Sequence, residues 1–198
     1  MYSYLKRIID ILISLTALIV LLPLYIIIAL FVLLSSGYPV FYYQERIGRS
    51  WKPFSIIKFR TMVKGADKIG PGITSSTDER VTSAGRILRK YKLDELPQFF
   101  NVLKGDMSLI GPRPELLKYI NFYREDYCSI LNIKPGITDY AAIIYRDEET
   151  LLGKSNKEES YITRILPSKI ELYKKYMAEM GFYTDVKILL NTVRVMIQ

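Results

Sequence analysis

An uncharged, mostly apolar run near the start of the sequence limits how the chain can fold. From Ile11 to Tyr43 there is no charged residue, and Ile11 to Leu34 is almost wholly apolar. At about 1.5 Å per residue the apolar part would form roughly 36 Å of helix, enough to cross a hydrocarbon core of about 30 Å. The run is too long for a signal peptide, and no small-residue cleavage pattern precedes a secreted domain. The sequence therefore predicts a membrane helix, for which a single span is the plainest form.

Two features favour a re-entrant helix over a single span. Pro23 falls near the middle of the run, where it removes a helix hydrogen bond and bends the chain. Basic residues also flank both ends of the run, namely Lys6, Arg7, Arg46, Arg49 and Lys52. The positive-inside bias then suits both ends lying on the cytoplasmic face. We expect residues 1–38 to form a re-entrant membrane helix bent near Pro23, and residues 39–198 to form one membrane-associated cytoplasmic domain.

Charge and composition limit the chemistry. The net charge of +8 favours anionic partners, such as nucleic acid, a phosphorylated substrate or anionic lipid. The chain has no histidine and a single cysteine, Cys128, which excludes Ser-His and Cys-His nucleophilic schemes, histidine metal sites and an internal disulfide. Acid–base and metal chemistry must then fall to Asp, Glu, Lys, Tyr and water.

The rest of the pattern predicts an α+β, mostly helical fold. Short β-prone runs at 40–43 and 54–59 predict a small hairpin, in which Lys58 and Arg60 would share one face. Residues 64–80 predict a loop. Further along we expect an amphipathic helix over 116–132, a turn at 134–138 leading to a strand over 141–145, a loop or frayed helix over 147–160, and closing helices over about 168–180 and 183–197.

Two adjacent carboxylates, Asp94 and Glu95, lie within the unusual stretch 85–115. Apolar residues recur at helical spacing before them, and Pro97 disfavours helix at the preceding residue but suits the first turn of a new one. Gly105 would end that second helix. The acid pair should therefore lie at a break between two helices, close to backbone N–H groups and cations.

Two interpretations of the acid pair remain open on this pattern alone. Surface acids near a helix start are common, because the helix dipole favours them. Alternatively, Asp94 attacks a phosphorus atom, which would require a divalent cation and arginines to offset the repulsion between carboxylate and phosphate. Arg86, Arg89 and Arg113 would supply the arginines.

Several blocks in one order resemble the monotopic phosphoglycosyl transferases, also called bacterial sugar transferases. The resemblance covers roughly residues 4–138 and is carried by Lys6-Arg7…Asp10, QERIG at 44–48, KFRTM at 58–62, DERVTSAGR at 78–86, LDELPQ at 93–98, NVLKGDMS at 101–108 and LIGPRPE at 109–115. Ordered blocks of this kind are far more specific than a lone motif.

The resemblance implies transfer of a sugar-1-phosphate from a UDP-sugar to undecaprenyl phosphate, with UMP released, at the start of surface-glycan synthesis. It implies that Asp94 is the nucleophile of a phosphosugar-aspartyl intermediate, and that Asp94 and Glu95 are catalytic and hold Mg²⁺. Arg113 would stabilise the transferring phosphoryl group, and the weaker candidates for binding the diphosphate are Lys58, Arg60, Arg86 and Arg146.

The family's re-entrant geometry implies a location in the bacterial inner membrane, with the catalytic domain facing the cytoplasm and interfacial helices contacting membrane lipids. A homodimer is left open, and nucleic acid is not an expected partner. Two departures from the family pattern stand out. Leu22 replaces the serine that commonly precedes the proline at the bend, and residues 139–147 differ from the family's usual continuation, so we expect them to tune donor choice.

Two further functions remain as alternatives. A membrane-bound, Mg²⁺-dependent hydrolase of UDP-sugars would use water in place of the lipid acceptor. A basic membrane-binding module without enzymatic activity would give Asp94 no chemical role.

Overall fold

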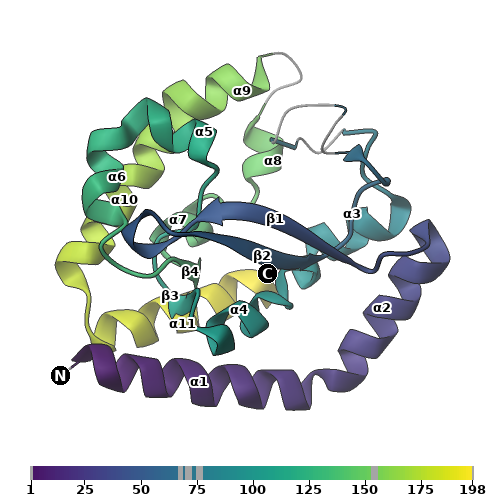
Figure 1. Ribbon diagram of the computed structural model, residues 1–198, viewed down its shortest axis with the longest axis horizontal. Helices are drawn as coiled ribbons and strands as arrows, with labels where there is room; N and C mark the ends of the chain where they lie inside the picture. The colour runs from purple at the N-terminus through teal and green to yellow at the C-terminus, as the bar shows by residue number, and fades with distance from the viewer. Residues whose placement is uncertain (1, 67–68, 70–72, 75–77, 153–155, 198) are drawn as a thin grey trace.

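The computed structural model describes residues 2–66, 69, 73–74, 78–152 and 156–197, and it is mostly helical with two small sheets (Figure 1). Strands β1 (Phe41–Ile47) and β2 (Pro53–Phe59) pair antiparallel, with Phe41 opposite Phe59 and Ile47 opposite Pro53. The turn between them contains the short helix η1 (Arg49–Trp51). The predicted hairpin and the mostly helical character are confirmed.

The apolar N-terminal run forms two helices that meet at an angle of 63°. Helix α1 (Tyr2–Val20) ends just before Leu21, and α2 (Leu22–Ser36) carries Pro23 in its first turn, where a missing N–H breaks no helix bond. The predicted bend near Pro23 is confirmed. By length and composition no single helix among the described residues could cross a membrane, whereas this bent pair together passes the same test.

Helix α1 turns its polar side chains toward the rest of the protein and its apolar ones outward. Arg7 donates to the carbonyls of Val102 and Leu103 at 2.6 and 2.9 Å, and Asp10 accepts from the Leu109 N–H at 3.0 Å. Asp10 and Ser14 are buried, whereas the large apolar side chains of Leu12, Leu15 and Ile19 are exposed. This polarity is the reverse of that of a helix on the surface of a soluble domain.

The middle of the chain alternates short helices and strands. After the hairpin come α3 (Ser83–Lys90), η3 (Leu93–Glu95), α4 (Gln98–Lys104) and β3 (Ser108–Ile110). The described residues of the 64–80 segment form turns and irregular backbone, as predicted, and a bridge between Met62 and Val81 joins its two ends. The expected helix over 116–132 is divided into α5 (Leu117–Ile120), η4 (Asn121–Tyr123) and α6 (Arg124–Ile130).

The predicted strand over 141–145 is wrong. These residues form helix α7 (Tyr140–Ile144), because the Asp139 side chain caps it by accepting from the Ala142 N–H at 2.6 Å. The strand lies earlier, as β4 (Gly136–Thr138), and pairs parallel with β3. The β3–β4 sheet was not predicted.

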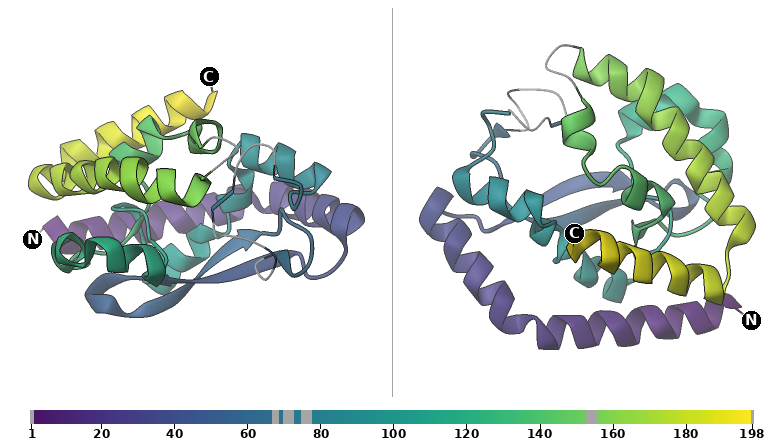
Figure 2. Two further views of the ribbon diagram at one scale, coloured as in Figure 1. Left: turned by 90° about the horizontal axis from the view of Figure 1, so that it is seen from above. Right: turned by 180° about the vertical axis from the view of Figure 1, so that it is seen from behind.

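The C-terminal part is helical, as predicted, and covers one side of the molecule. It comprises α8 (Glu148–Leu151), α9 (Lys157–Ser160), the π-helical turn η5 (Tyr161–Ile165), α10 (Leu166–Glu179) and α11 (Phe182–Ile197). Figure 2 shows α10 and α11 on the side opposite to the β1–β2 hairpin, with α1 running between the two levels. Several of the chain's 16 tyrosines, including Tyr119, Tyr127, Tyr173 and Tyr176, are buried in the core between these elements.

Candidate active site

The acid pair lies at the predicted break between two helices. Thr82 caps α3 by accepting from the Gly85 N–H at 3.0 Å, and α3 ends shortly before Lys92, which adopts a left-handed conformation (φ 53°). The short turn η3 then carries Asp94 and Glu95, and α4 follows Pro97. Gly105 ends α4 with φ 93°, a conformation that glycine adopts without strain.

A cavity of about 820 Å³ opens beside η3, within the usual size range of ligand sites. Its walls come from the hairpin, the α3–α4 region, the Gly-Pro-Arg-Pro segment, α7, α8, α10 and α11. Of the predicted site residues, those that line it are Lys58, Arg60, Asp94, Glu95, Arg113 and Arg146. Arg86 is exposed on α3 and is not among the lining residues.

Glu95 is held by two cations from other parts of the chain. Arg113 donates to both carboxylate oxygens, with Nη1 at 3.0 Å from Oε2, and Lys58 Nζ donates to Oε1 at 2.9 Å. Burial would raise the pKa of Glu95, but Arg113 and Lys58 outweigh it and hold the pKa well below its usual range. Glu95 is therefore ionised and fixed in orientation.

Asp94 has a different environment from its neighbour. It is 5 % exposed, and within the described chain its Oδ1 atom has no hydrogen-bond partner. Burial raises its pKa, the Lys58 ammonium opposes the shift, and the Glu95 carboxylate adds to it. A buried carboxylate oxygen without a partner is costly unless a ligand, a cation or a reacting atom meets it.

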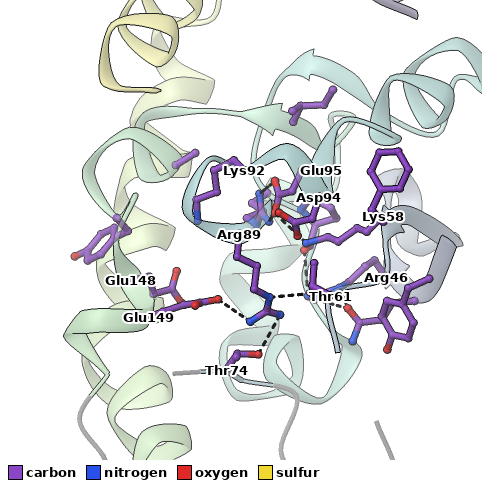
Figure 3. Close-up of a pocket in the computed structure, with 18 of the residues that line it drawn as sticks. Arg46, Lys58, Thr61, Thr74, Arg89, Lys92, Asp94, Glu95, Glu148 and Glu149 are labelled. Atoms are coloured by element: carbon purple, nitrogen blue, oxygen red, sulfur yellow. Dashed lines mark hydrogen bonds and ion pairs between the residues drawn. The ribbon is translucent and has the colours of Figure 1, made fainter. Parts of the chain in front are cut away.

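Arg89 also lines the cavity and adds a cation to it (Figure 3). Its guanidinium donates to Thr61 Oγ1 at 3.0 Å, to Glu149 Oε1 at 2.9 Å and to Thr74 Oγ1 at 3.4 Å. Figure 3 shows Glu148 and Glu149 of α8 on the opposite side of Arg89 from the acid pair. The sequence pattern indicates Arg89 only as a nearby cation, because helical spacing alone does not tell which of Arg86 and Arg89 faces the cavity.

The other predicted cations have partners in the protein. Arg60 Nη2 donates to the Ser36 carbonyl at 2.7 Å and to the Gly37 carbonyl, so its guanidinium caps the C-terminal end of α2. Lys58 and Arg60 both line the cavity, but only Lys58 reaches the acid pair. Arg146 donates to the Val195 carbonyl of α11.

A buried carboxylate missed by sequence reasoning supports the Gly-Pro-Arg-Pro segment. Asp139 is 1 % exposed and accepts from the Arg113 N–H at 3.1 Å with the oxygen that does not cap α7. Burial raises its pKa to about 6, although the two N–H groups and Lys169 lower it in part. The only sequence signal was its departure from the family pattern at this position.

The described residues contain no group of three or more His, Cys, Asp or Glu side chains that could hold a metal ion. Both oxygens of Glu95 are bonded to cations, so Asp94 is the carboxylate with an oxygen to offer. Mg²⁺ commonly binds through one or two carboxylates together with substrate phosphates. The site fits a cation that arrives with a phosphorylated substrate better than a cage made wholly of protein groups.

The arrangement can therefore do two things. It offers a buried carboxylate oxygen to an incoming electrophile or cation. It also places Lys58 and Arg89 near that carboxylate and Arg113 on the neighbouring Glu95, and the charges of these cations suit phosphate groups.

Comparison with known proteins agrees with this chemistry. The bacterial sugar transferase family model matches residues 1–198. The chain is 36 % identical over 196 residues to a UDP-N-acetylgalactosamine-undecaprenyl-phosphate N-acetylgalactosaminephosphotransferase of Aeromonas hydrophila, covering 98 % of this chain and 44 % of that protein. It is 40 % identical over 194 residues to a UDP-glucose:undecaprenyl-phosphate glucose-1-phosphate transferase of Escherichia coli strain K12, covering 96 % of this chain and 39 % of that protein.

A third relative is similar to this chain over most of its own length. The uncharacterized sugar transferase EpsL of Bacillus subtilis strain 168 is 40 % identical over 194 residues, covering 96 % of this chain and 86 % of that protein. The chain thus spans less than half of the Aeromonas and Escherichia relatives but most of the Bacillus one. The resemblance found in the sequence motifs is confirmed: this chain belongs to the bacterial sugar transferase family.

Proposed function

We propose that this protein transfers a sugar-1-phosphate from a UDP-sugar to undecaprenyl phosphate, giving undecaprenyl-diphosphate-sugar and UMP. The observation that carries the proposal is the buried Asp94 carboxylate, which has one oxygen without a partner among the described residues and lies in a cation-lined cavity. The activities named for the Aeromonas and Escherichia relatives support the donor and acceptor classes. The reaction would begin the synthesis of a bacterial surface glycan.

The chemistry proceeds in two displacements at phosphorus. An Asp94 oxygen attacks the β-phosphorus of the donor, and the bond from that phosphorus to the bridging oxygen breaks, so that UMP leaves with the bridging oxygen. A phosphate oxygen of the lipid acceptor then attacks the same phosphorus and releases the Asp94 carboxylate. Covalent catalysis of this kind divides an exchange between a soluble donor and a membrane-bound acceptor into two steps at one site.

Asp94 and Glu95 have separate roles in this scheme. Asp94 must be ionised to attack, and the Lys58 ammonium favours its ionised form against the effect of burial. Glu95 holds the guanidinium of Arg113 and the ammonium of Lys58 in place through three hydrogen bonds. These cations then offset charge on the transferring phosphoryl group without having to reorganise.

Arg89 and Arg146 line the same cavity and are positioned to contact the diphosphate or the UMP leaving group. Arg60 caps α2 and would act on substrate only through the position of that helix, and Arg86 lies outside the cavity lining. Both remain candidates on the family motif alone.

A magnesium ion fits the donor set as a partner of Asp94 and the donor phosphates. When bound, it would neutralise phosphate charge and so reduce the repulsion that the carboxylate meets. Glu95 would favour binding of the ion through its negative charge, because its own oxygens already accept hydrogen bonds from Lys58 and Arg113.

The bent α1–α2 pair would lie in the inner membrane as a re-entrant helix, with both ends and the catalytic domain on the cytoplasmic side. The outward apolar side chains of α1 and the 63° bend support this arrangement. Arg60 links the end of α2 to the strand segment that carries Lys58, so the membrane helix and the site are mechanically joined. A lipid acceptor could then present its phosphate to the cavity without leaving the bilayer.

Release of nucleotide from the purified full chain tests the proposal. The protein is assayed in detergent with Mg²⁺, undecaprenyl phosphate and a panel of UDP-sugars. It should release UMP with at least one of the sugars, and release over multiple turnovers should require the lipid. Asp94→Asn should abolish this release, since an amide is a poor nucleophile and has no negative charge to balance that of a cation.

Other outcomes would identify a different reaction. Release of UMP over many turnovers without the lipid would show a hydrolase, and release of UDP would show ordinary glycosyl transfer without attack on phosphorus. Full activity of Asp94→Asn would contradict the role of Asp94, whichever acceptor is used.

A further inference from the structure

The cavity lining includes a buried lysine that the proposed phosphoryl chemistry does not use. Lys169, on α10, lines the cavity and is 4 % exposed. Its ammonium donates to Glu148 of α8, and it lies 5.1 Å from the ring centre of Tyr161 and 6.0 Å from that of Tyr145. A lysine is seldom buried unless it is paired, because removing an ammonium from water is costly.

This group is close to the reacting centre, although it comes from a distant part of the sequence. Glu148 and Tyr173 help to raise the pKa of Arg113, which holds Glu95, and Lys169 lowers the pKa of Asp139, which accepts from the Arg113 N–H. Tyr145, Glu148 and Tyr173 also line the cavity. Arg113 therefore contacts Glu95 of the acid pair and lines the same cavity as Lys169, Glu148 and their tyrosines, a group that we call the Lys169 subsite.

The chemistry of the Lys169 subsite differs from that of the phosphate-binding part of the cavity. Glu148 and the adjacent Glu149 introduce carboxylates, which repel a diphosphate, and Glu148 already neutralises Lys169. Aromatic rings add apolar surface beside the ion pair. A neutral, polyhydroxylated group suits this combination, since hydroxyls can donate to a carboxylate and accept from an ammonium, while the rings cover apolar C–H faces.

The donor of the proposed reaction has one such part, the sugar. We propose that Lys169 and Glu148 bind the hydroxyl or acylamino groups of the donor sugar and so determine which UDP-sugar the protein accepts. This inference rests on the proposed function and extends it to the choice of substrate. The sugar must lie next to the β-phosphate that Asp94 attacks, and the presence of Asp94, Arg113 and the Lys169 subsite in the lining of one cavity is consistent with that requirement.

The inference predicts a change in sugar discrimination that leaves nucleotide recognition intact. Lys169→Met keeps the length of the side chain and removes its charge and donors, and Glu148→Gln keeps the shape and removes the carboxylate. In each variant the ratio of kcat/KM between the preferred UDP-sugar and its C4 epimer or acetamido analogue should fall about tenfold or more. Inhibition by UMP should stay within about twofold of wild type.

Lys174→Met is the matched control, because Lys174 lies on the same helix, has a partly exposed side chain, pairs with Asp126 and Glu171, and is not among the residues that line the cavity. It should leave both the sugar ratio and the inhibition by UMP unchanged. If thermal unfolding shows that Lys169→Met is not folded, Glu148→Gln alone tests the inference.

Two outcomes would overturn the inference. An unchanged sugar ratio in the folded variants would make the ion pair structural, and a parallel loss of UMP inhibition would make it part of a nucleotide site. Failure of the proposed function is a separate result, because it would leave wild type itself without UMP release for any sugar.

Discussion

Asp94 and Glu95 are adjacent in the sequence but differ in their hydrogen-bond partners. Glu95 has three hydrogen bonds from two cations, while Asp94 is buried with one oxygen lacking a partner in the described chain. Pro97 and the helical spacing predict that both lie at a helix break, but this pattern does not separate their roles. The difference depends on the left-handed turn at Lys92 and on Lys58 and Arg113, which arrive from remote parts of the chain.

At the same scale, Asp139 should make stability depend on pH. Its pKa rises from 3.8 when unfolded to about 6 when buried, so between these values the folded state binds more protons than the unfolded state. The Asp139 contribution to stability is therefore fully present below about pH 4 and is lost as pH rises to about 6, by up to about 3 kcal/mol.

Asp139→Asn removes this titration, so the Tm of the variant relative to wild type should rise between pH 4 and pH 7. Thermal unfolding in detergent at several pH values measures the difference, and Asp147→Asn, at an exposed position, is the control. A difference in Tm that stays constant with pH would contradict a raised pKa at Asp139.

At the scale of elements, the predictions succeeded where local pattern decides structure. Residue periodicity predicts the hairpin and the two closing helices. Pro97 predicts the break between α3 and α4, and Gly105 predicts the end of α4. The predicted strand over 141–145 failed because a single capping side chain, Asp139, converts an apolar run into α7. The parallel pairing of β3 with β4 joins three-residue strands distant in sequence, for which there is no periodic signal.

The packing of α3 on the segment after β2 gives an element-scale prediction. A Cβ atom at Gly85 would lie 2.0 Å from the Thr61 carbonyl oxygen, so Gly85→Ala must push α3 away from the backbone beside the hairpin. We expect a destabilisation of about 2–3 kcal/mol or more, and loss of UMP release because Arg89 and η3 move with α3.

The matched control is Gly181→Ala, whose added Cβ would meet nothing closer than 3.8 Å. Thermal unfolding and UMP release measure both variants. Normal stability and activity of Gly85→Ala would mean that α3 does not pack as described.

At the scale of the whole molecule, the inward polar side chains of α1 join the apolar N-terminal segment to the rest of the protein. Sequence analysis recognised the apolar run, but not that Arg7, Asp10 and Ser14 form an inward polar stripe that meets the end of α4 and the start of β3. The contacts of that stripe are tertiary. The cavity also depends on tertiary contacts, because its walls come from many segments of the chain, from the hairpin to α11.

Removing the buried carboxylate of the stripe should loosen this docking. Asp10→Ala leaves the Leu109 N–H without its acceptor, at a cost of about 1–3 kcal/mol, or a fall in Tm of about 3–10 °C. Thr16→Ala, at an exposed position of α1, should leave the Tm nearly unchanged. Equal effects of the two substitutions would show that α1 is not held by Asp10.

The most direct test of the central claim is to trap the phosphosugar on the protein. Donor labelled at the β-phosphate, added without lipid acceptor, should release up to one UMP per protein and leave the label on the tryptic peptide Leu93–Lys104, which contains Asp94. The label should leave as lipid-linked product when undecaprenyl phosphate is added, and Asp94→Asn should never acquire it. Rapid transfer to the lipid with no labelled peptide at any time would show direct displacement, and would contradict Asp94 as the nucleophile.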